Sequence, residues 1–427
     1  MFKIGLCGLG TVGKNLISHI TKYQEKISNN CGQDIMISMI ADRSIDKKKV
    51  DIKNVELSSD VHSVVDSDCD LIIELIGGTD IALDLVKQAI NNGKSVITAN
   101  KALIAEHGDE LFKLSNDKNV YLGFEAAVAG AIPIIKTLTH NMCNEKILSI
   151  SGIINGTCNY ILDQMTSENK NFQDALVSAQ ELGYAESDPT FDIGGYDAAH
   201  KISILAMLAY GINSPYKQVH IEGIESIESM DIDYASELGY KIKHVGLVKN
   251  DHDAIECRVH PVLIHNSNIL SNVDGVMNAI RTKGDKFGTS MQYGHGAGGE
   301  ATASAVVSNI IDFSDFKNKS NIKHSNVFGK IIKINNIVDT YSSYYLRIFA
   351  NDVPGVMAEV TATLASYDIS IEAVTQHEPT KKDKLIPIVM ITNYVNHNKI
   401  LSAVDQIEAL KNTNGKVNII RVFNDDE

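Results

Sequence analysis

The stretch KIGLCGLGTVG (residues 3–13) decides the fold of the first part of the chain. A short apolar run leads into Gly8, Gly10 and Gly13, which have the spacing G-x-G-x-x-G, and a helix-like segment follows to about Lys26. A glycine turn between a strand and a helix is typical of units that bind a dinucleotide. We therefore predict a strand, a phosphate-binding turn and a helix at the N-terminus.

Each glycine of this turn has a physical reason to be there. Gly8 permits the tight turn, Gly10 lets a pyrophosphate approach the backbone, and Gly13 lets the helix pack closely on the sheet. Thr11 and Val12 open the helix, and their amides can donate to phosphate. The alternative is an ordinary tight turn that binds nothing.

The residues after the second predicted strand (35–41) bear on the choice of cofactor. Asp42 would accept from a ribose 2′-hydroxyl, which favours NAD. Its neighbour Arg43 could stack on adenine or pair with a 2′-phosphate, which favours NADP. The order Asp-Arg leaves both cofactors open.

Strands and helices alternate through the first part of the chain. Such alternation predicts right-handed βαβ units, a parallel sheet and an α/β Rossmann domain. From about Gly130 the pattern changes to an α+β domain for substrate binding and dimerisation, and a compact βαββα module near the C-terminus looks ferredoxin-like. We predict a dinucleotide-binding domain, a substrate and catalytic domain, a linker and a C-terminal module, at residues 1–130 (completed by about 294–315), 131–312, 313–342 and 343–427.

An acidic stretch, ELGYAESDPTFDIGGYDAAHK (residues 181–201), precedes an apolar run that we predict to be helical. In such a helix Asp197 and Lys201 would lie on one face, one turn apart. Glu186 and Asp192 would lie near the same end. This suits a pocket for a small cationic substrate with a lysine that moves a proton. The alternative is a solvated surface pair, which is commoner for an acid and a lysine four residues apart.

The composition excludes some classes of partner. The net charge of −14 argues against nucleic-acid and anionic-membrane partners, and 44% hydrophobic residues describe an ordinary globular protein. Six scattered cysteines without a C-x-x-C pair are typical of reduced thiols, so we expect a cytoplasmic protein.

Several stretches together resemble homoserine dehydrogenase of the bacterial type with a C-terminal ACT domain. They occur in the family's order and extend from Gly8 to Ile310. The matching stretches are GLGTVG (8–13), ADRS (41–44), ELIGGT (74–79), TANKALIAEHG (98–108), FEAAVAGAIPII (124–135), GIINGTCNYIL (152–162), ELGYAESDPTFDIGGYDAAHK (181–201) and GAGGEATASAVVSNI (296–310).

The resemblance implies reversible, NAD(P)-dependent oxidation of L-homoserine to L-aspartate 4-semialdehyde, in the biosynthesis of threonine, methionine and isoleucine. It makes Lys201 the acid/base, with Asp197 one turn before it. It makes Glu186 and Asp192 contacts of homoserine, and places Lys101 near nicotinamide and substrate. We assign Gly183 and Thr157 to the substrate as well, and further cofactor contacts to Thr98, Asn100, Gly298 and Gly299.

Two of these assignments have structural alternatives. Thr157 could bind the substrate carboxylate, or belong to a plain strand-to-helix turn. Gly298 and Gly299 could approach nicotinamide, or allow close helix packing. A sodium-type cation held by carbonyls of Glu125, Val128, Gly130 and Ile132 is implied by the resemblance alone.

The C-terminal module contains a turn that resembles the ligand-binding turn of ACT domains. It consists of Asp352, Pro354, Gly355 and Val356, at a strand-to-helix junction whose amides suit a carboxylate. The family implies threonine as a feedback inhibitor, and dimers or tetramers joined through these modules. The alternative is a module that only mediates assembly.

The principal rival function is a non-catalytic protein that senses NAD(P) and an amino acid. Such a protein would be expected to lose Lys201 or the carboxylates, and none is lost. A second rival, a phosphorylating semialdehyde dehydrogenase, would need an active cysteine near a base, and no cysteine of this sequence has that setting.

Overall fold

The computed structural model describes residues 1–48, 54–251, 254–318, 329, 332–377 and 385–424. The chain forms two compact units, and each is assembled from three separate stretches of sequence. The first unit contains residues 1–148, 200–217 and 280–332, and the second contains residues 149–199, 218–279 and 333–427.

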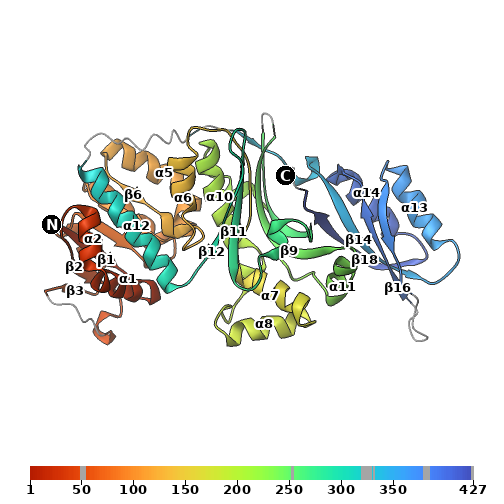
Figure 1. The fold of residues 1–427 in the computed structure, drawn as a ribbon, viewed down its shortest axis with the longest axis horizontal. Helices are drawn as coiled ribbons and strands as arrows, with labels where there is room; N and C mark the ends of the chain where they lie inside the picture. Colours follow the sequence, from red (N-terminus) through yellow and green to blue (C-terminus); the bar gives the residue numbers. More distant parts are fainter. Residues whose placement is uncertain (49–53, 252–253, 319–328, 330–331, 378–384, 425–427) are drawn as a thin grey trace. The chain divides into compact units, whose positions relative to one another are not determined.

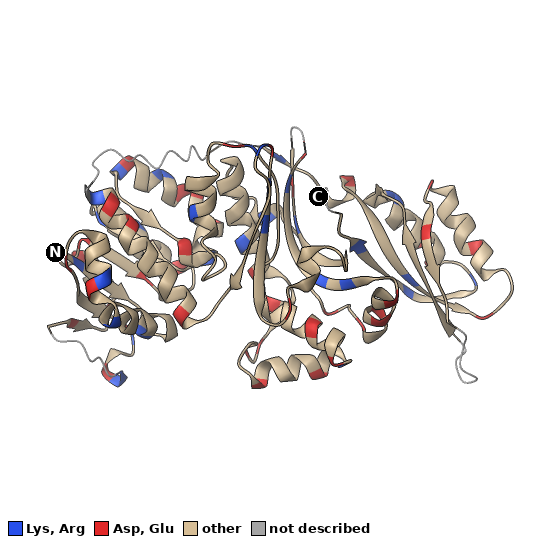
Figure 2. Ribbon diagram, viewed as in Figure 1, with Lys and Arg blue, Asp and Glu red and all other residues tan. Residues whose placement is uncertain are grey.

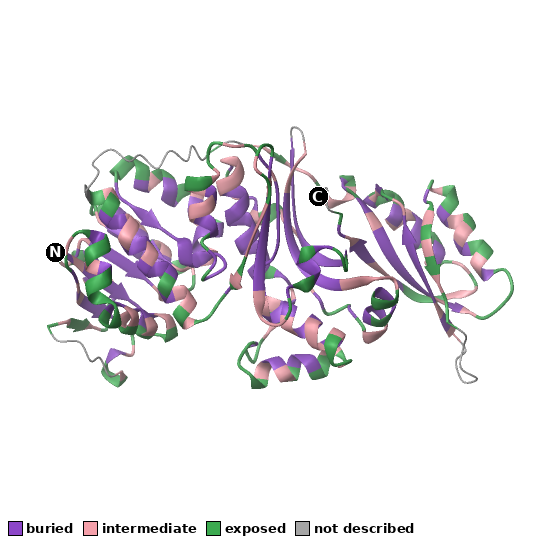
Figure 3. Cartoon of the chain, viewed as in Figure 1, coloured by how far each residue is buried: buried purple, intermediate pink, exposed green. Residues whose placement is uncertain are grey.

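The first unit contains a parallel sheet of six strands in the order β3-β2-β1-β4-β5-β6 (Figure 1). The two central strands β1 and β4 are almost wholly buried (Figure 3), as expected for a sheet covered on both faces. This confirms the predicted Rossmann-like domain. The strands are β1 (Phe2–Cys7), β2 (Ile35–Ala41), β3 (Glu56–Ser58), β4 (Leu71–Glu74), β5 (Ser95–Thr98) and β6 (Leu122–Gly123).

The helices of this unit differ from the prediction in two places. The first predicted helix is two helices that meet at Tyr23, and α12 continues to Asn318, where we had expected a linker. The rest of that linker includes 319–328 and 330–331, which lie outside the described residues. The helices are α1 (Thr11–Lys22), α2 (Gln24–Cys31), α3 (Ser63–Asp66), α4 (Asp80–Asn91), α5 (Lys101–Lys118), α6 (Ile134–Lys136) and α12 (Gly299–Asn318).

Helix α12 is distant in sequence but belongs to the N-terminal core. It packs beside α1, and its Val306, Ile310 and Phe313 share one buried cluster with Phe2 and Leu6 of β1. Charged residues of both signs occur on the outer helices (Figure 2), while the buried apolar residues of α12 pack in the core beside the sheet. Helix α12, which follows the second glycine cluster of the sequence, therefore belongs to the core of the N-terminal sheet.

The second unit contains a mixed sheet in the order β7-β9-β10-β18-β14-β16-β15. Strand β10 pairs with β18 of the C-terminal module, Val262 opposite Arg421 and Leu263 opposite Val422, so one sheet runs through both parts. The strands are β7 (Ile147–Ile153), β9 (Tyr240–Asp251), β10 (Ala254–His265), β14 (Tyr341–Asn351), β15 (Ile371–Thr375), β16 (Leu385–Thr392) and β18 (Thr413–Val422).

The C-terminal module has the predicted ferredoxin-like order, β14-α13-β15-β16-α14-β18. Helices α13 (Val356–Ser366) and α14 (His397–Glu408) pack together with one face of the strands around their own core (Figure 1), which contains Leu346, Val360 and Ile400. The remaining short strands are β8 (His220–Ile221), β13 (Lys333–Ile334) and β17 (Val395–Asn396).

The substrate part contributes five helices. Helix α7 starts at Gly156, directly after Asn155, whose side chain caps its first turn. The hairpin of β11 (Met277–Gly284) and β12 (Gly288–His295) was not predicted. The helices are α7 (Gly156–Ser167), α8 (Phe172–Glu181), α9 (Thr190–Ile193), α10 (Tyr196–Tyr210) and α11 (Ser229–Glu237). The predicted boundaries of the four parts stay a prediction.

Candidate active site

The glycine turn after β1 has the geometry that its spacing predicts. Gly8 has φ of +102°, and a Cβ there would lie 2.5 Å from the carbonyl oxygen of Leu75. A Cβ at Gly13 would lie 2.3 Å from the carbonyl oxygen of Gly8. At Gly10, by contrast, an added Cβ would meet no described heavy atom within 4 Å, and φ is −81°. Nothing in the described fold therefore requires a glycine at position 10, which leaves close approach of a ligand as its physical reason.

The turn borders a cavity of about 940 Å³, large enough for part of a dinucleotide. Its walls come from the ends of the parallel strands, where ligands of open α/β sheets bind. The lining includes Gly8, Gly10, Asp42, Arg43, Ser44, Lys48, His62, Gly77, Gly78 and Thr79.

Asp42 lies at one end of this cavity, and its carboxylate is heavily engaged. Oδ2 accepts from the amide of Leu9 (2.7 Å) and from Nζ of Lys48 (2.6 Å), while Oδ1 accepts from the amide and hydroxyl of Ser44 (2.9 and 2.8 Å). Partial burial acts to raise the pKa of Asp42, but these hydrogen bonds outweigh it and hold the pKa well below its usual range. Asp42 thus fixes the glycine turn as an anion.

A buried carboxylate, that of Glu74, lies behind the residues 76–77 that line the cavity. Glu74 is fully buried at the end of β4, accepts from the amides of Ile76 and Gly77 at 2.7 and 3.1 Å, and accepts from the hydroxyl of Thr98. Burial raises its pKa against the effect of these hydrogen bonds. The side chain of Asn100 accepts from the amide of Leu103 and so caps helix α5. Thr98 and Asn100 therefore support the cavity wall. Reasoning from the sequence missed Glu74, although it stands in the quoted ELIGGT stretch.

Helix α10 carries the predicted pair Asp197 and Lys201. It starts at Tyr196, so the two residues are one turn apart on one helix. Asp197 exposes only 4% and Lys201 only 7% of its surface. The surface-pair alternative is therefore wrong, because solvated pairs are not buried in this way. The boundary between the two units passes through α10, with Asp197 in the second unit and Lys201 in the first.

Asn155 joins two of the predicted carboxylates. Its Nδ2 donates to Oδ1 of Asp192 at 2.8 Å and to Oδ2 of Asp197 at 2.9 Å, so both amide hydrogens are used. Its Oδ1 accepts from the amide of Cys158 at 2.7 Å, which caps α7. Thr157 donates to the carbonyl of Tyr184 at 2.7 Å and lies 3.4 Å from Asp192. No role for Asn155 was predicted from the sequence.

The other residues of the acidic stretch are more exposed. Glu186 is exposed, and its carbonyl accepts from Gln180 at 3.1 Å. Gly183 has φ of +74° directly after α8, the conformation that terminates a helix. Asp188 accepts from the amide of Thr190 at 3.1 Å, as expected for a turn residue rather than a ligand.

Gly298 and Gly299 were predicted either to approach nicotinamide or to allow close helix packing, and the two glycines differ in this respect. A Cβ at Gly299 would lie 2.4 Å from Asn15 and 3.0 Å from Thr11, which favours close helix packing as its reason. Gly298 has φ of +110° and no described heavy atom within 4 Å of an added Cβ. Thr11 and Val12 open α1, and Lys101 is the first residue of α5.

Comparisons with known proteins identify the family. Residues 8–125 match the profile of the homoserine dehydrogenase NAD-binding domain, 133–311 that of homoserine dehydrogenase and 344–412 that of the ACT domain. A homoserine dehydrogenase of Pseudomonas aeruginosa is 42% identical over 98% of both chains. The chain belongs to the homoserine dehydrogenase family. Its activity is that of a homoserine dehydrogenase, an NAD(P)-dependent oxidoreductase.

Solved structures agree with this membership. The crystal structure of a homoserine dehydrogenase from Thiobacillus denitrificans superimposes with a TM-score of 0.94 at 40% identity, over 99% of this chain and 98% of that one. A hyperthermophilic archaeal homoserine dehydrogenase in complex with NADPH gives a TM-score of 0.63 at 28% identity, over 73% of this chain and 97% of that one. The fold and the ACT domain are thus those of the family's longer form.

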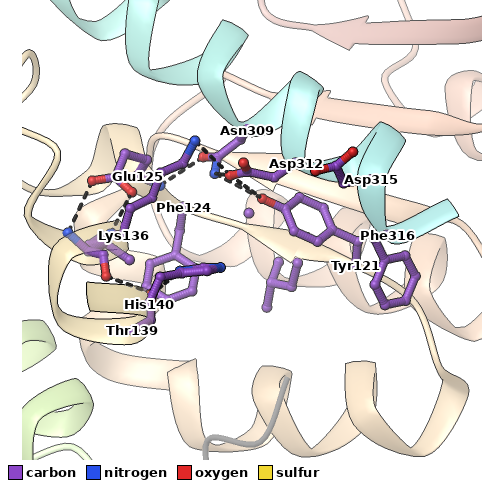
Figure 4. A pocket seen from close by; sticks show the side chains of 13 residues that line it. Tyr121, Phe124, Glu125, Lys136, Thr139, His140, Asn309, Asp312, Asp315 and Phe316 are labelled. Atoms are coloured by element: carbon purple, nitrogen blue, oxygen red, sulfur yellow. Dashed lines mark hydrogen bonds and ion pairs between the residues drawn. The ribbon is translucent and has the colours of Figure 1, made fainter. Parts of the chain in front are cut away.

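The segment that the family resemblance links to a cation is buried and tightly held. The carboxylate of Glu125 accepts from the amides of Ile135 and Lys136, both at 3.0 Å, and its own amide donates to Asn309 at 2.8 Å (Figure 4). Burial raises the pKa of Glu125 to about 7. Because the carboxylate is used by these amides, backbone carbonyls are the oxygens this segment can offer a hard cation.

The backbone of that segment is unusual. Ala129 and Gly130 have φ of +54° and +46°, and a Cβ at Gly130 would lie 3.0 Å from the carbonyl of Gly296. Val128 and Ile132 are buried on either side. The segment is thus a buried, closely packed loop with left-handed backbone at two successive residues. In the described part of the chain, no group of three or more His, Cys, Asp or Glu residues could hold a metal ion.

The ACT turn is exposed before α13. Asp352, Pro354 and Gly355 lie at the surface, Gly355 has φ of +101°, and Val356 is the first residue of the helix. The described helices include none that is both long and apolar enough to span a bilayer.

Proposed function

We propose that the enzyme interconverts L-homoserine and L-aspartate 4-semialdehyde with Lys201 as acid/base. The observation that carries this assignment is the buried position of Lys201 one turn after Asp197, whose carboxylate is held together with that of Asp192 by Asn155. A buried lysine one helical turn after a buried carboxylate is a candidate for proton transfer.

The chemistry needs one hydride and one proton to leave the alcohol. The nicotinamide of the bound cofactor accepts the hydride from the alcohol carbon. Lys201 takes the hydroxyl proton in the oxidation and returns it to the carbonyl oxygen in the reduction, so the atoms balance. Asp197, one turn earlier on the same helix, is the proposed residue that orients this lysine.

Homoserine also carries an ammonium and a carboxylate. Asp192 and Glu186 offer carboxylates for charge-assisted bonds to the ammonium. We propose that Thr157 and the backbone at Gly183 contact the substrate near its carboxylate. Lys101, at the N-terminus of α5, orients cofactor and substrate rather than moving the proton.

The test is replacement of Lys201. Lys201→Ala and Lys201→Met should each lower kcat for homoserine oxidation by about 100-fold or more, the usual contribution of a positioned acid/base. Binding of NADPH, followed by its fluorescence, should stay within twofold of the wild type. A variant that keeps more than a tenth of wild-type kcat would refute the assignment.

We further propose that the enzyme prefers NADP. The four hydrogen bonds to Asp42 occupy its carboxylate oxygens, so it is poorly placed to accept from a ribose 2′-hydroxyl. Arg43, Ser44 and Lys48 line the same cavity and offer donors to a 2′-phosphate. We expect kcat/KM to be at least tenfold higher with NADP than with NAD, and equal or reversed values would overturn this.

A sodium-type cation at the carbonyls of Glu125, Val128, Gly130 and Ile132 is part of the proposal. The occupied carboxylate of Glu125 and the positive φ values beside it support the use of backbone oxygens. If this is right, replacing sodium by tetramethylammonium should lower thermal stability as well as activity, and an identical melting temperature in both salts would contradict it.

We propose that the ACT domain binds threonine at Asp352–Val356 and inhibits the enzyme. The amides at the start of α13 suit an amino-acid carboxylate. The test needs the full chain, because the ACT strands share a core with the substrate part. Threonine should inhibit the wild type, and Asp352→Ala should raise the half-inhibiting concentration at least tenfold with unchanged basal activity. A wild type that is indifferent to threonine would leave assembly as the module's role.

The remaining proposals concern setting and assembly. We place the enzyme in the cytoplasm as a homodimer or a homotetramer joined through the ACT domains, which light scattering can measure. The rival, a non-catalytic sensor of NAD(P) and an amino acid, predicts cofactor binding without turnover of homoserine.

A further inference from the structure

Asp231 is a fully buried carboxylate where the ACT domain meets the substrate part. Oδ1 accepts from Nε of Arg347 at 2.6 Å and from the hydroxyl of Tyr345 at 3.0 Å. Oδ2 accepts from Nη2 of Arg347 at 3.0 Å and from Nδ2 of Asn418 at 2.8 Å. All three donors belong to ACT strands, β14 and β18. We call Asp231, Tyr345, Arg347 and Asn418 the Asp231 junction.

The junction is built into the start of helix α11. Asp231 is the third residue of that helix, and its Oδ2 also accepts from the amide of Glu228 at 3.1 Å, one half of a capping box. The ACT strands therefore hold the same side chain that fixes the helix N-terminus. Asp231 and Arg347 are both buried, so loss of either partner would leave the other charge unpaired away from water, and the contact is strongly constrained.

Apolar contacts also join the ACT strands to the substrate part. Tyr345, Val389 and Ile420 of the ACT strands belong to one buried cluster with Leu162 of α7 and Ile232 of α11. Tyr344, the preceding residue on β14, belongs instead to the core between the ACT strands and their own helices. Successive side chains of a strand point to opposite faces, so one face of the ACT sheet serves its helices and the other serves the substrate part.

Helix α7 extends this arrangement to the site. Helix α11 packs against α7, and α7 in turn packs against α9, which carries Asp192. At the N-terminus of α7, Asn155 holds Asp192 and Asp197, and Thr157 bonds the loop before α9. A chain of packed, hydrogen-bonded elements thus runs from Tyr345 to both carboxylates, which is the physical requirement for coupling between two places.

We propose that the Asp231 junction sets the position of α7, and that Tyr345 is thereby a positioning residue for the amino-acid substrate. The inference rests on the substrate roles proposed for Asp192 and Asp197. Loosening the junction lets α7 move with its N-terminal cap, so the carboxylates lose their fixed spacing. Cofactor contacts lie in the first unit, so the effect falls on homoserine.

The test compares two adjacent tyrosines in the full-length enzyme. Tyr345→Phe removes the hydrogen bond to Asp231 but keeps the ring. Tyr344→Phe is the matched control, because Tyr344 is equally buried and its hydroxyl lies 3.0 Å from Nδ1 of His397, within the ACT domain. We expect Tyr345→Phe to raise KM for homoserine at least threefold with KM for NADP unchanged. Tyr344→Phe should leave both KM values at the wild-type level.

Melting temperatures separate positioning from loss of stability. Both variants lose one buried hydrogen bond, so both melting temperatures should fall by similar amounts, and only Tyr345→Phe should change KM for homoserine. Asn418→Ala, at the rim of the junction, should raise this KM in the same direction and by less. Equal KM values for homoserine in the two tyrosine variants, raised or not, would overturn the inference. A wild type that does not oxidise homoserine would instead refute the proposed function.

Discussion

The amide nitrogen of Asn155 donates a 2.9 Å hydrogen bond to the carboxylate of Asp197. The other hydrogen of that amide goes to Asp192, so one neutral side chain fixes the spacing of two carboxylates. The two hydrogen bonds from one amide group offset part of the repulsion between the two carboxylates. Asn155 therefore fixes Asp192 of α9 relative to Asp197 of α10, the helix that also carries Lys201.

Asn155→Ser tests this role. Serine can still cap α7, so the loss of stability should come from the hydrogen bonds to the two carboxylates and amount to about 1–3 kcal/mol. Serine cannot reach both carboxylates, so kcat/KM for homoserine should fall by about 10-fold to 100-fold, as for an interaction worth about 1.4–2.8 kcal/mol. Steady-state kinetics and thermal melting measure the two effects. Unchanged kcat/KM would mean that Asp192 and Asp197 need no common donor.

Gly10→Ala separates ligand binding from folding. An added Cβ meets no described heavy atom within 4 Å and φ is ordinary, so stability should stay within about 0.5 kcal/mol of the wild type. KM for the cofactor should rise tenfold or more, because the methyl group occupies the path of the pyrophosphate. Gly13→Ala is the contrast, since its Cβ would lie 2.3 Å from a carbonyl oxygen and should destabilise the fold. Normal cofactor binding by Gly10→Ala would contradict the close approach of a ligand to the backbone at Gly10.

Lys48→Ala addresses cofactor choice. Loss of the lysine leaves Oδ2 of Asp42 with the Leu9 amide as its one described donor, so it can also accept a ribose hydroxyl, and it removes a cation from the proposed 2′-phosphate site. The ratio of kcat/KM for NADP to that for NAD should fall about tenfold, a change of about 1.4 kcal/mol. Lys47→Ala is the matched control, because Lys47 is exposed and is absent from the described lining of the cavity. An equal fall in both variants would point to general charge rather than to Lys48.

The ACT domain should show a pH-dependent stability that originates at His397. Nε2 of His397 lies 3.2 Å from Nη2 of Arg421, and a guanidinium can only donate, so this nitrogen is an unprotonated acceptor. Burial, followed by the charge of Arg421, lowers the pKa of His397 to about 4 from 6.5. The folded pKa is depressed, so the unfolded chain binds the proton first as the pH falls.

Stability should therefore be lost between about pH 6.5 and pH 4, by up to about 3 kcal/mol from this residue alone. His397→Gln keeps an acceptor for Arg421 but does not titrate. Its melting temperature should fall less steeply over that range than that of the wild type. Parallel pH profiles for the two proteins would show that His397 contributes no such linkage.

Much of the fold was predictable because its signals are local. The glycine spacing at Gly8–Gly13, the alternation of strands and helices, and the order of the ACT elements all depend on neighbours in sequence. The errors fall where local signals are weak. The break at Tyr23 has no glycine or proline to mark it, and α12 runs to Asn318 through polar residues that the packing of its other face keeps helical.

The residue types of the site were determined by the sequence alone: a dinucleotide turn, an acidic loop, and Asp197 and Lys201 four residues apart. Only the tertiary structure decided that this pair is buried and that Asn155 joins Asp192 to Asp197. It also decided that the carboxylate of Asp42 accepts hydrogen bonds from its own chain. The physical reason is separation along the chain. The contact between Asn155 and Asp192 spans 37 residues and that between Asp231 and Asn418 spans 187, and no local periodicity encodes which distant groups share one hydrogen bond.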